Sequence, residues 1–132
     1  MITLCNSIKF FEEKKMKSLK EKQLIEMANA PIDITGCPCI IWIQTKGKES
    51  SFDDMPNIKF QDDKSTNLQP DKLVPVSIDD NPQILLKNYT PQLQSRDIKK
   101  IKQWVIINKD LLLKHWNGQI TSYETFSNCK KI

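Results

Sequence analysis

Glycine is scarce in this chain, whose 132 residues include only Gly36, Gly47 and Gly118. Loops that bind nucleotide phosphates wrap their ligand with the backbone of several closely spaced glycines. Three glycines so far apart cannot build such a loop. Nucleotide hydrolysis by a P-loop is therefore excluded.

Long apolar runs are also missing. The longest is Cys39–Ile43, far below the roughly 20 residues that a helix needs to cross a bilayer. The first residues, MITLCNSIKFFEEKK, contain no basic leader followed by an apolar stretch of about 7 to 15 residues, which is the pattern of a secretion signal. We therefore expect a cytoplasmic location and no membrane partner.

Few residues are suited to metal binding. The chain has four cysteines, Cys5, Cys37, Cys39 and Cys129, and one histidine, His115. In a reducing compartment free thiols are the expected state. The Cys37-Pro-Cys39 pair lacks the two-residue spacing of a zinc knuckle, and a tetrahedral site would need other ligands to converge on it by folding. We expect no metal and no cofactor.

Catalysis is not expected either, because no nucleophile and base stand in a recognisable motif. One enzymatic alternative stays open: a small hydrolase in which His115 acts with Cys129 from the last helix. This alternative requires that replacing His115 abolishes turnover while the protein still folds.

The composition is that of a folded protein, with 39% hydrophobic and 27% charged residues. The length fits one domain. We expect a single α+β domain over residues 1–132, with an N-terminal helical region (1–35), strands and loops (36–94) and C-terminal helices (95–132). The net charge of +4, from 20 basic and 16 acidic residues, is too small to identify the partner.

The first part of the chain predicts a one-sided helix. Residues 2–10 fit a strand or a helix start equally well. Strong helix formers then fill Glu12–Asn29, with Met16, Leu19, Gln23 and Met27 roughly on one face, and Pro31 ends the segment.

Three short strands are predicted in the middle of the chain, at residues 40–43, 56–61 and 73–78. The alternation in 56–61 suggests one face open to water. Pro75 favours an edge position or a bulge, because proline cannot donate to a strand ladder. We expect a small, mainly antiparallel sheet covered by the N-terminal helix and a long C-terminal helix.

The long helix is predicted to run over residues 95–117. Ser95 is the expected N-terminal cap and Gly118 the left-handed terminating residue. Thr121 and Glu124 resemble the capping box of a short final helix.

One face of the long helix carries two polar residues on an apolar stripe. The stripe comprises Ile98, Ile101, Val105, Asn108, Leu112 and His115, with Trp104, Leu111 and Trp116 beside it. Buried polar groups are normally hydrogen-bonded within the protein. We therefore expect Asn108 and His115 to be structural, with Asn108 fixing the helix against the turn 77–82. The alternative is a polar network that binds a ligand.

Acidic pairs stand in the predicted connectors, at Asp53–Asp54, Asp62–Asp63 and Asp79–Asp80. Such pairs can hold Mg²⁺, but aspartate is also common in turns and caps, which is the interpretation favoured here. Connectors on a rigid framework often carry binding residues. The loop 79–92, with the connector 44–56, is therefore the expected partner-binding surface, represented by Asp79, Asp80 and Tyr89.

A basic set lies mostly on the polar side of the long helix: Arg96, Lys99, Lys100 and Lys102. These residues could contact phosphate, but no exposed aromatic residue for stacking on bases is evident. A nucleic-acid-binding regulator using this set is the alternative function.

The segments VPVSIDDNPQIL and IKQWVIINKDLLLKHWNGQITSYETF resemble a loosely defined group of small uncharacterised bacterial proteins. The resemblance covers about the last 60 residues. The matching positions are Ser77, Ile78, Asp80, Pro82, Trp104, Asn108, Leu111, Leu112, Trp116 and Gly118. Related domains are often encoded in pairs that look like toxin and antitoxin modules. The resemblance therefore implies an accessory or regulatory role and carries no catalytic residue.

These observations predict a non-enzymatic protein that acts by binding another protein, as an antitoxin, an immunity protein or an inhibitor of a host defence system does. A homodimer through a sheet edge or through the N-terminal helix is also compatible with the sequence.

Overall fold

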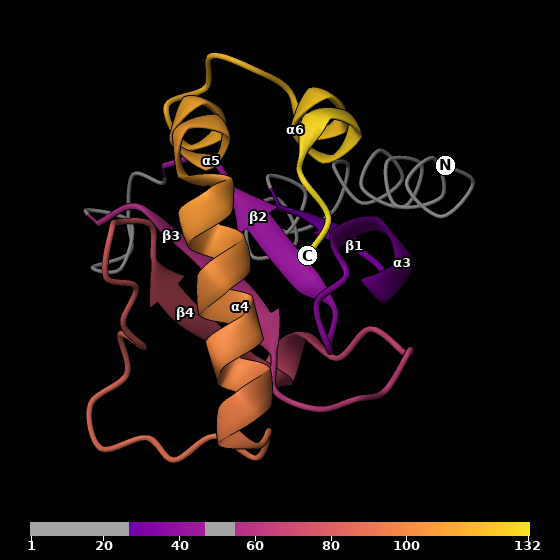
Figure 1. Cartoon of the computed structure of the whole chain (residues 1–132), viewed down its shortest axis with the longest axis vertical. Coiled ribbons are helices and arrows are strands. Elements are labelled where there is room, and N and C mark those ends of the chain that lie inside the picture. The colour runs from indigo at the N-terminus through magenta and orange to yellow at the C-terminus, as the bar shows by residue number, and fades with distance from the viewer. Residues whose placement is uncertain (1–26, 47–54) are drawn as a thin grey trace, which may run out of the picture.

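A computed structural model describes residues 27–46 and 55–132 (Figure 1). The strands are β1 (Met27–Ala30), β2 (Ile41–Gln44), β3 (Asn57–Gln61) and β4 (Leu73–Ser77). The helices are α3 (Ile32–Thr35), the 3-10 turn η2 (Pro70–Lys72), α4 (Ser95–Ile107), α5 (Lys109–Trp116) and α6 (Ser122–Asn128). The α+β class is thereby confirmed. None of the helices in this part of the chain is long and apolar enough to span a bilayer.

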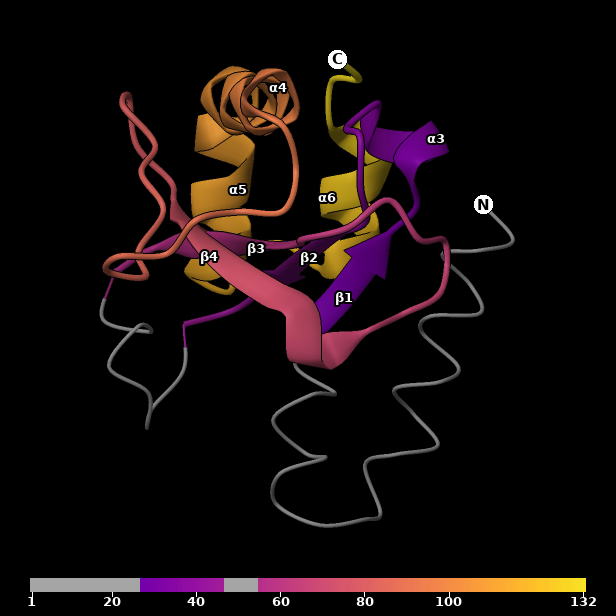
Figure 2. The ribbon, with the colours of Figure 1, turned by 90° about the horizontal axis from the view of Figure 1, so that it is seen from below.

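The strands form one antiparallel sheet in the order β1-β2-β3-β4, so each strand pairs with its neighbour in sequence. The register aligns Ile41 with Phe60 and Phe60 with Val74, and all three side chains are buried. They join Ile101 and Trp104 of α4 in one apolar cluster. Figure 2 shows the sheet nearly edge-on with α4 above it.

The predicted strands of the middle segment are confirmed, and Pro75 does lie on an edge strand, β4. The outer edge of β4 is partly paired, because Val76 forms an isolated antiparallel bridge with Ile84. The open face expected for 56–61 is wrong. Asn57 and Gln61 are both fully buried, and their amides therefore need partners within the protein.

The end of the predicted N-terminal helix is also wrong. Met27, Ala28 and Asn29 belong to β1, where Ala28 lies opposite Ile43 of β2. All four residues of β1 are buried, and β2 supplies hydrogen-bond partners for the backbone groups of β1 that face it. Tertiary packing thus overrides local helix propensity. The remainder of that helix, the choice for 2–10 and part of the connector 44–56 lie outside the described residues.

The predicted helix 95–117 is two helices, α4 and α5, which meet at Asn108. The Asn108 side chain donates to the Trp104 carbonyl, four residues back, at 3.0 Å. The same carbonyl also accepts from the Asn108 backbone amide at 3.1 Å, so the side chain shares this acceptor with the helical backbone, and local side-chain bonds of this kind disturb helices. Ser95 is not the cap, because the N-cap is Gln94 and no side chain caps α4.

Two local predictions at the C-terminal end are confirmed. Gly118 has a left-handed φ of 75° just after α5. Thr121 and Glu124 form a reciprocal capping box at α6. These signals hold because they depend only on nearby backbone groups.

The last residues of the chain pack against α3 and Gly36, and Figure 1 shows the C-terminus beside α3. The Ile132 amide donates to the Thr35 carbonyl at 2.9 Å. Gly36 has a φ of 77°, and a Cβ atom placed there would lie only 2.3 Å from the Ile132 carbonyl oxygen. Glycine at position 36 is therefore required both by its conformation and by this close approach.

We expect Gly36→Ala to destabilise the protein more than Gly118→Ala. Both substitutions place a side chain in a left-handed conformation, at a cost of about 1 to 2 kcal/mol. Only Gly36 also faces backbone, since the space around Gly118 is open. Urea unfolding of the two variants measures the difference. Equal losses of unfolding free energy would show that the close approach to Ile132 carries no energetic cost.

Candidate partner-binding surface

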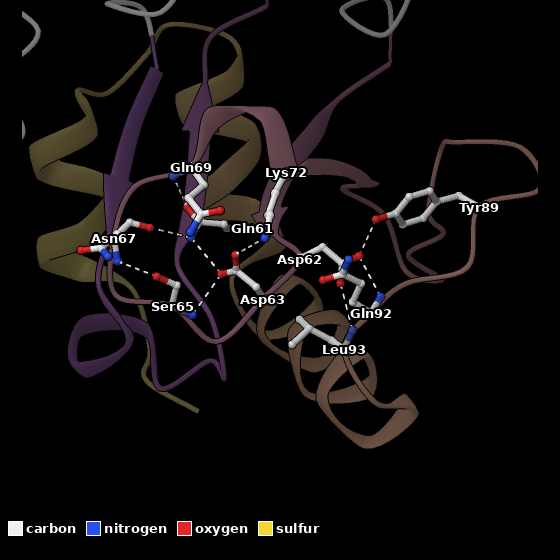
Figure 3. A network of polar contacts seen from close by, with 10 residues as sticks. All are labelled: Gln61, Asp62, Asp63, Ser65, Asn67, Gln69, Lys72, Tyr89, Gln92 and Leu93. Atoms are coloured by element: carbon white, nitrogen blue, oxygen red, sulfur yellow. Dashed lines mark hydrogen bonds and ion pairs between the residues drawn. The ribbon is translucent and has the colours of Figure 1, made fainter.

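The connection from β4 to α4, residues 78–94, is held in place by one buried carboxylate. Asp62, which directly follows β3, is 2% exposed. It accepts hydrogen bonds from the Gln92 amide at 2.8 Å, from the Leu93 amide at 3.0 Å and from the Tyr89 hydroxyl. Figure 3 shows the three donors gathered around it. The end of the loop is thus tied to the end of β3.

A second polar network lies beside the first and fixes the residues after β3 (Figure 3). The buried Gln61 amide donates to Asp63 at 3.0 Å and to the Asn67 carbonyl at 2.8 Å, and it accepts from the Gln69 amide at 2.9 Å. Asp63 also pairs with Lys72 at 3.3 Å. Asp62 therefore projects from a segment that is itself well anchored.

The start of the loop is held to β4. Ser77 and Gln83 exchange two hydrogen bonds, from the Ser77 amide to the Gln83 carbonyl at 3.0 Å and from the Gln83 amide to Ser77 Oγ at 2.9 Å. The Asp79 carboxylate accepts from the Asn81 amide at 2.8 Å, which closes a local turn. The connection is thus ordered at both ends.

The predicted contact residues Asp79, Asp80 and Tyr89 all lie on this loop and are exposed. Tyr89 keeps 38% of its surface exposed while its hydroxyl is bound to Asp62. Burial of the hydroxyl, together with the hydrogen bond and the charge of Asp62, raises the pKa of Tyr89 to about 12. The ring is therefore held in a fixed position and stays neutral.

The start of the loop also contacts the helices, through an exposed ion pair. Lys109, the first residue of α5, lies 2.8 Å from an Asp80 carboxylate oxygen. The hydrogen bond and charge of Asp80 raise the pKa of Lys109. The contact brings the start of the loop close to the junction of α4 and α5, although exposed pairs of this kind contribute little to stability.

The basic set lies on α4, as predicted from its spacing. Arg96, Lys99 and Lys100 are exposed and Lys102 is partly exposed. Within the described part of the chain none of these four forms an ion pair; the pairs found there join Lys64 to Asp97, Lys72 to Asp63 and Lys109 to Asp80. Their charges are therefore available to a partner.

Asn108 is buried, but it does not contact the turn 77–82. Its side chain binds the backbone of Lys130 twice, accepting from the amide at 2.7 Å and donating to the carbonyl at 3.0 Å. The expected contact is thus replaced by one with the end of the chain. No local pattern signals this partner, because Lys130 follows the last helix in an irregular segment.

His115 is buried between α5 and α6, where its Nε2 lies 2.9 Å from Ser122 Oγ. Burial lowers the pKa of His115 to about 4, and a hydrogen bond with the backbone of Gln44 opposes the shift only in part. The ring is therefore neutral at physiological pH. No hydrogen bond links it to Cys129, whose thiol donates to the Phe126 carbonyl at 3.4 Å.

His115 should make stability depend on pH. Because its pKa is about 4 in the folded protein and about 6.5 when unfolded, the unfolded state binds more protons between these values. Stability should fall as pH decreases from 6.5 to 4, by up to about 3 kcal/mol, and should be insensitive to this group above pH 7. Unfolding of the protein and of His115→Gln at several pH values isolates the effect. Parallel curves for the two proteins would contradict it.

The cysteines offer no metal site among residues 27–46 and 55–132, where no three His, Cys, Asp or Glu side chains converge. Cys37 and Cys39 are buried, and burial raises the pKa of both thiols. They are therefore protonated at physiological pH. Cys5, Asp53 and Asp54 lie outside the described residues.

Sequence reasoning identified the exposed residues of the loop but missed the residue that holds them. The pair Asp62–Asp63 has the pattern of a turn, whereas the partners of Asp62 lie 27 to 31 positions away. The only local sign was an aspartate directly after a strand, which is common in turns.

Comparison with known proteins adds no functional assignment. No protein-family model, no curated protein sequence and no solved structure matches the chain. The function must be inferred from the described residues themselves.

Proposed function

We propose that this is a small non-enzymatic protein that acts by binding another protein through the loop 78–94. The role is that of an accessory protein such as an antitoxin, an immunity protein or an inhibitor of a host defence system. One observation carries the proposal: the buried Asp62 carboxylate accepts hydrogen bonds from the Gln92 and Leu93 amides and from the Tyr89 hydroxyl, and so fixes the loop.

The length and order of this loop support a binding role. Irregular connections longer than roughly 12 to 15 residues are uncommon in compact domains and usually carry function. Here both ends are tied down, at Asp62 and at Ser77. A surface that is ordered before binding loses less conformational entropy when a partner docks.

The exposed groups of the loop suit contact with protein. Asp79 and Asp80 present carboxylates to solvent, and Tyr89 presents part of an aromatic ring whose position is fixed. Tyrosine is enriched among the residues that dominate interface energies, because it buries a large area at low entropic cost.

The experiment is recovery of binding partners from a lysate of the encoding organism, treated with nuclease, with tagged protein as bait. We expect Asp79→Ala/Asp80→Ala to reduce the recovered partner at least tenfold. The matched control is Asp33→Ala/Asp71→Ala, which removes two exposed carboxylates elsewhere and should leave recovery unchanged. Thermal unfolding of each bait verifies that the variants are folded.

Two results would contradict the proposal. The first is equal recovery by wild type and the Asp79/Asp80 variant, which would place the contact away from the loop. The second is the absence of any stoichiometric protein that survives nuclease treatment, which would exclude protein binding as the activity.

A further inference from the structure

The outward face of α4 combines cationic side chains with two exposed aliphatic ones. Arg96, Lys99 and Lys100 occupy its N-terminal half. Ile106 and Ile107 lie at its C-terminal end and are 46% and 49% exposed, whereas Ile101 and Val105 of the same helix are completely buried. Two adjacent isoleucines left this open at the end of a packed helix require an explanation.

Helical spacing joins these residues into one strip. Residues three and four apart are neighbours on a helix surface. The exposed Gln103 is therefore next to Lys99 and Lys100 on one side and to Ile106 and Ile107 on the other. From Arg96 to Ile107 the strip is about 16 Å long at 1.5 Å per residue.

We infer that this strip binds an acidic protein surface with an apolar centre, an inference that rests on the proposed protein-binding function. The strip consists of Arg96, Lys99, Lys100, Gln103, Ile106 and Ile107. The cations lack ion-pair partners within the described part of the chain. Carboxylates of the partner would complement them, and its apolar side chains would cover the isoleucines. An apolar centre beside a charged rim is the usual anatomy of a protein interface.

The same features argue against nucleic acid as the occupant. A phosphate backbone gains nothing from covering isoleucine, and the strip contains no aromatic residue on which a base could stack. The carboxylates of Asp80 and Asp110 lie just beyond its C-terminal end, close to Lys109. They would repel phosphate groups where the cations end.

The experiment uses the full chain with a photoreactive benzoylphenylalanine at Gln103, in the strip, or at Lys87, in the loop, irradiated in lysate of the encoding organism. We expect a nuclease-resistant protein adduct at Gln103 whose cross-linked peptide is rich in aspartate and glutamate. Lys99→Glu/Lys100→Glu should lower its yield at least tenfold. The control Lys46→Glu/Lys131→Glu makes the same charge change elsewhere and should leave the yield of the adduct unchanged.

A second pair of substitutions tests the apolar part, because Ile106→Ser/Ile107→Ser removes the aliphatic groups and leaves the charges. It should lower the yield at least fivefold, and thermal unfolding of each variant verifies its folding. An adduct that nuclease destroys, or one insensitive to both pairs of substitutions, would overturn the inference. An adduct at Lys87 but none at Gln103 would refute the strip and leave the proposed function standing. Adducts at neither position would refute both.

Discussion

Asp62→Ala should release the loop 78–94 and lower the free energy of unfolding by about 3 to 5 kcal/mol, because it removes a buried charged acceptor from three donors. Two of those donors, the amides of Gln92 and Leu93, have Asp62 as their hydrogen-bond acceptor. We expect their hydrogen exchange to accelerate at least a hundredfold, while exchange in β2 and β3 follows the global loss of stability alone.

The matched control for this prediction is Tyr89→Phe, which removes only one of the three hydrogen bonds. It should cost about 1 to 2 kcal/mol and leave the two amides protected. If Asp62→Ala also left the amides of Gln92 and Leu93 protected, the loop would be held by other contacts, and the argument for an ordered binding surface would lose its basis.

Asn108→Leu should lower the free energy of unfolding by about 2 to 4 kcal/mol, because it removes the side chain of a buried residue that binds the part-buried amide and carbonyl of Lys130 and leaves both groups without this partner. The end of the chain should then detach from the α4–α5 junction. Urea unfolding measures the loss, and faster exchange of the Lys130 amide locates it.

Lys130→Ala is the control for Asn108, because Asn108 hydrogen-bonds to the backbone of Lys130 and Lys130 is an exposed residue. We expect a change within about 0.5 kcal/mol. A more stable Asn108→Leu variant that folds normally but no longer binds its partner would show that Asn108 serves binding instead of structure.

Asp62 and Asn108 are buried in different parts of the molecule. Asp62 positions the loop, whereas Asn108 anchors the last residues beside α3. The two sites share no hydrogen-bond partner among the described residues, so their effects on stability should add in the double variant within about 0.5 kcal/mol. Binding should respond to Asp62 more strongly if the loop is the contact surface.

Local patterns were sufficient for much of the fold. The β-branched run 40–43 and the alternation around Ile58 and Phe60 predicted β2 and β3. Pro75 predicted an edge strand, and Gly118 marked the end of α5. Each of these signals depends on backbone sterics or on side chains a few residues apart. All the residues that such a signal involves are therefore found within a short stretch of sequence.

Other features depended on partners distant in sequence. Met27–Ala30 is built from residues compatible with a helix, and it became a strand because β2 offered both backbone partners and a buried position. The long C-terminal helix was interrupted at Asn108, whose second partner, Lys130, lies 22 positions away. Helix propensity contains no information about either contact.

The candidate binding surface likewise has features that local sequence predicts and features that depend on distant residues. Exposure of Asp79, Asp80 and Tyr89 followed from a polar, proline-containing connector, because such segments run over the surface. That the loop is ordered, and that Tyr89 has one fixed position, was decided by Asp62 from 27 residues earlier. Any aspartate carboxylate can accept hydrogen bonds from the donors that lie near it in the fold. Which aspartate of this chain holds the loop therefore depends on the tertiary structure.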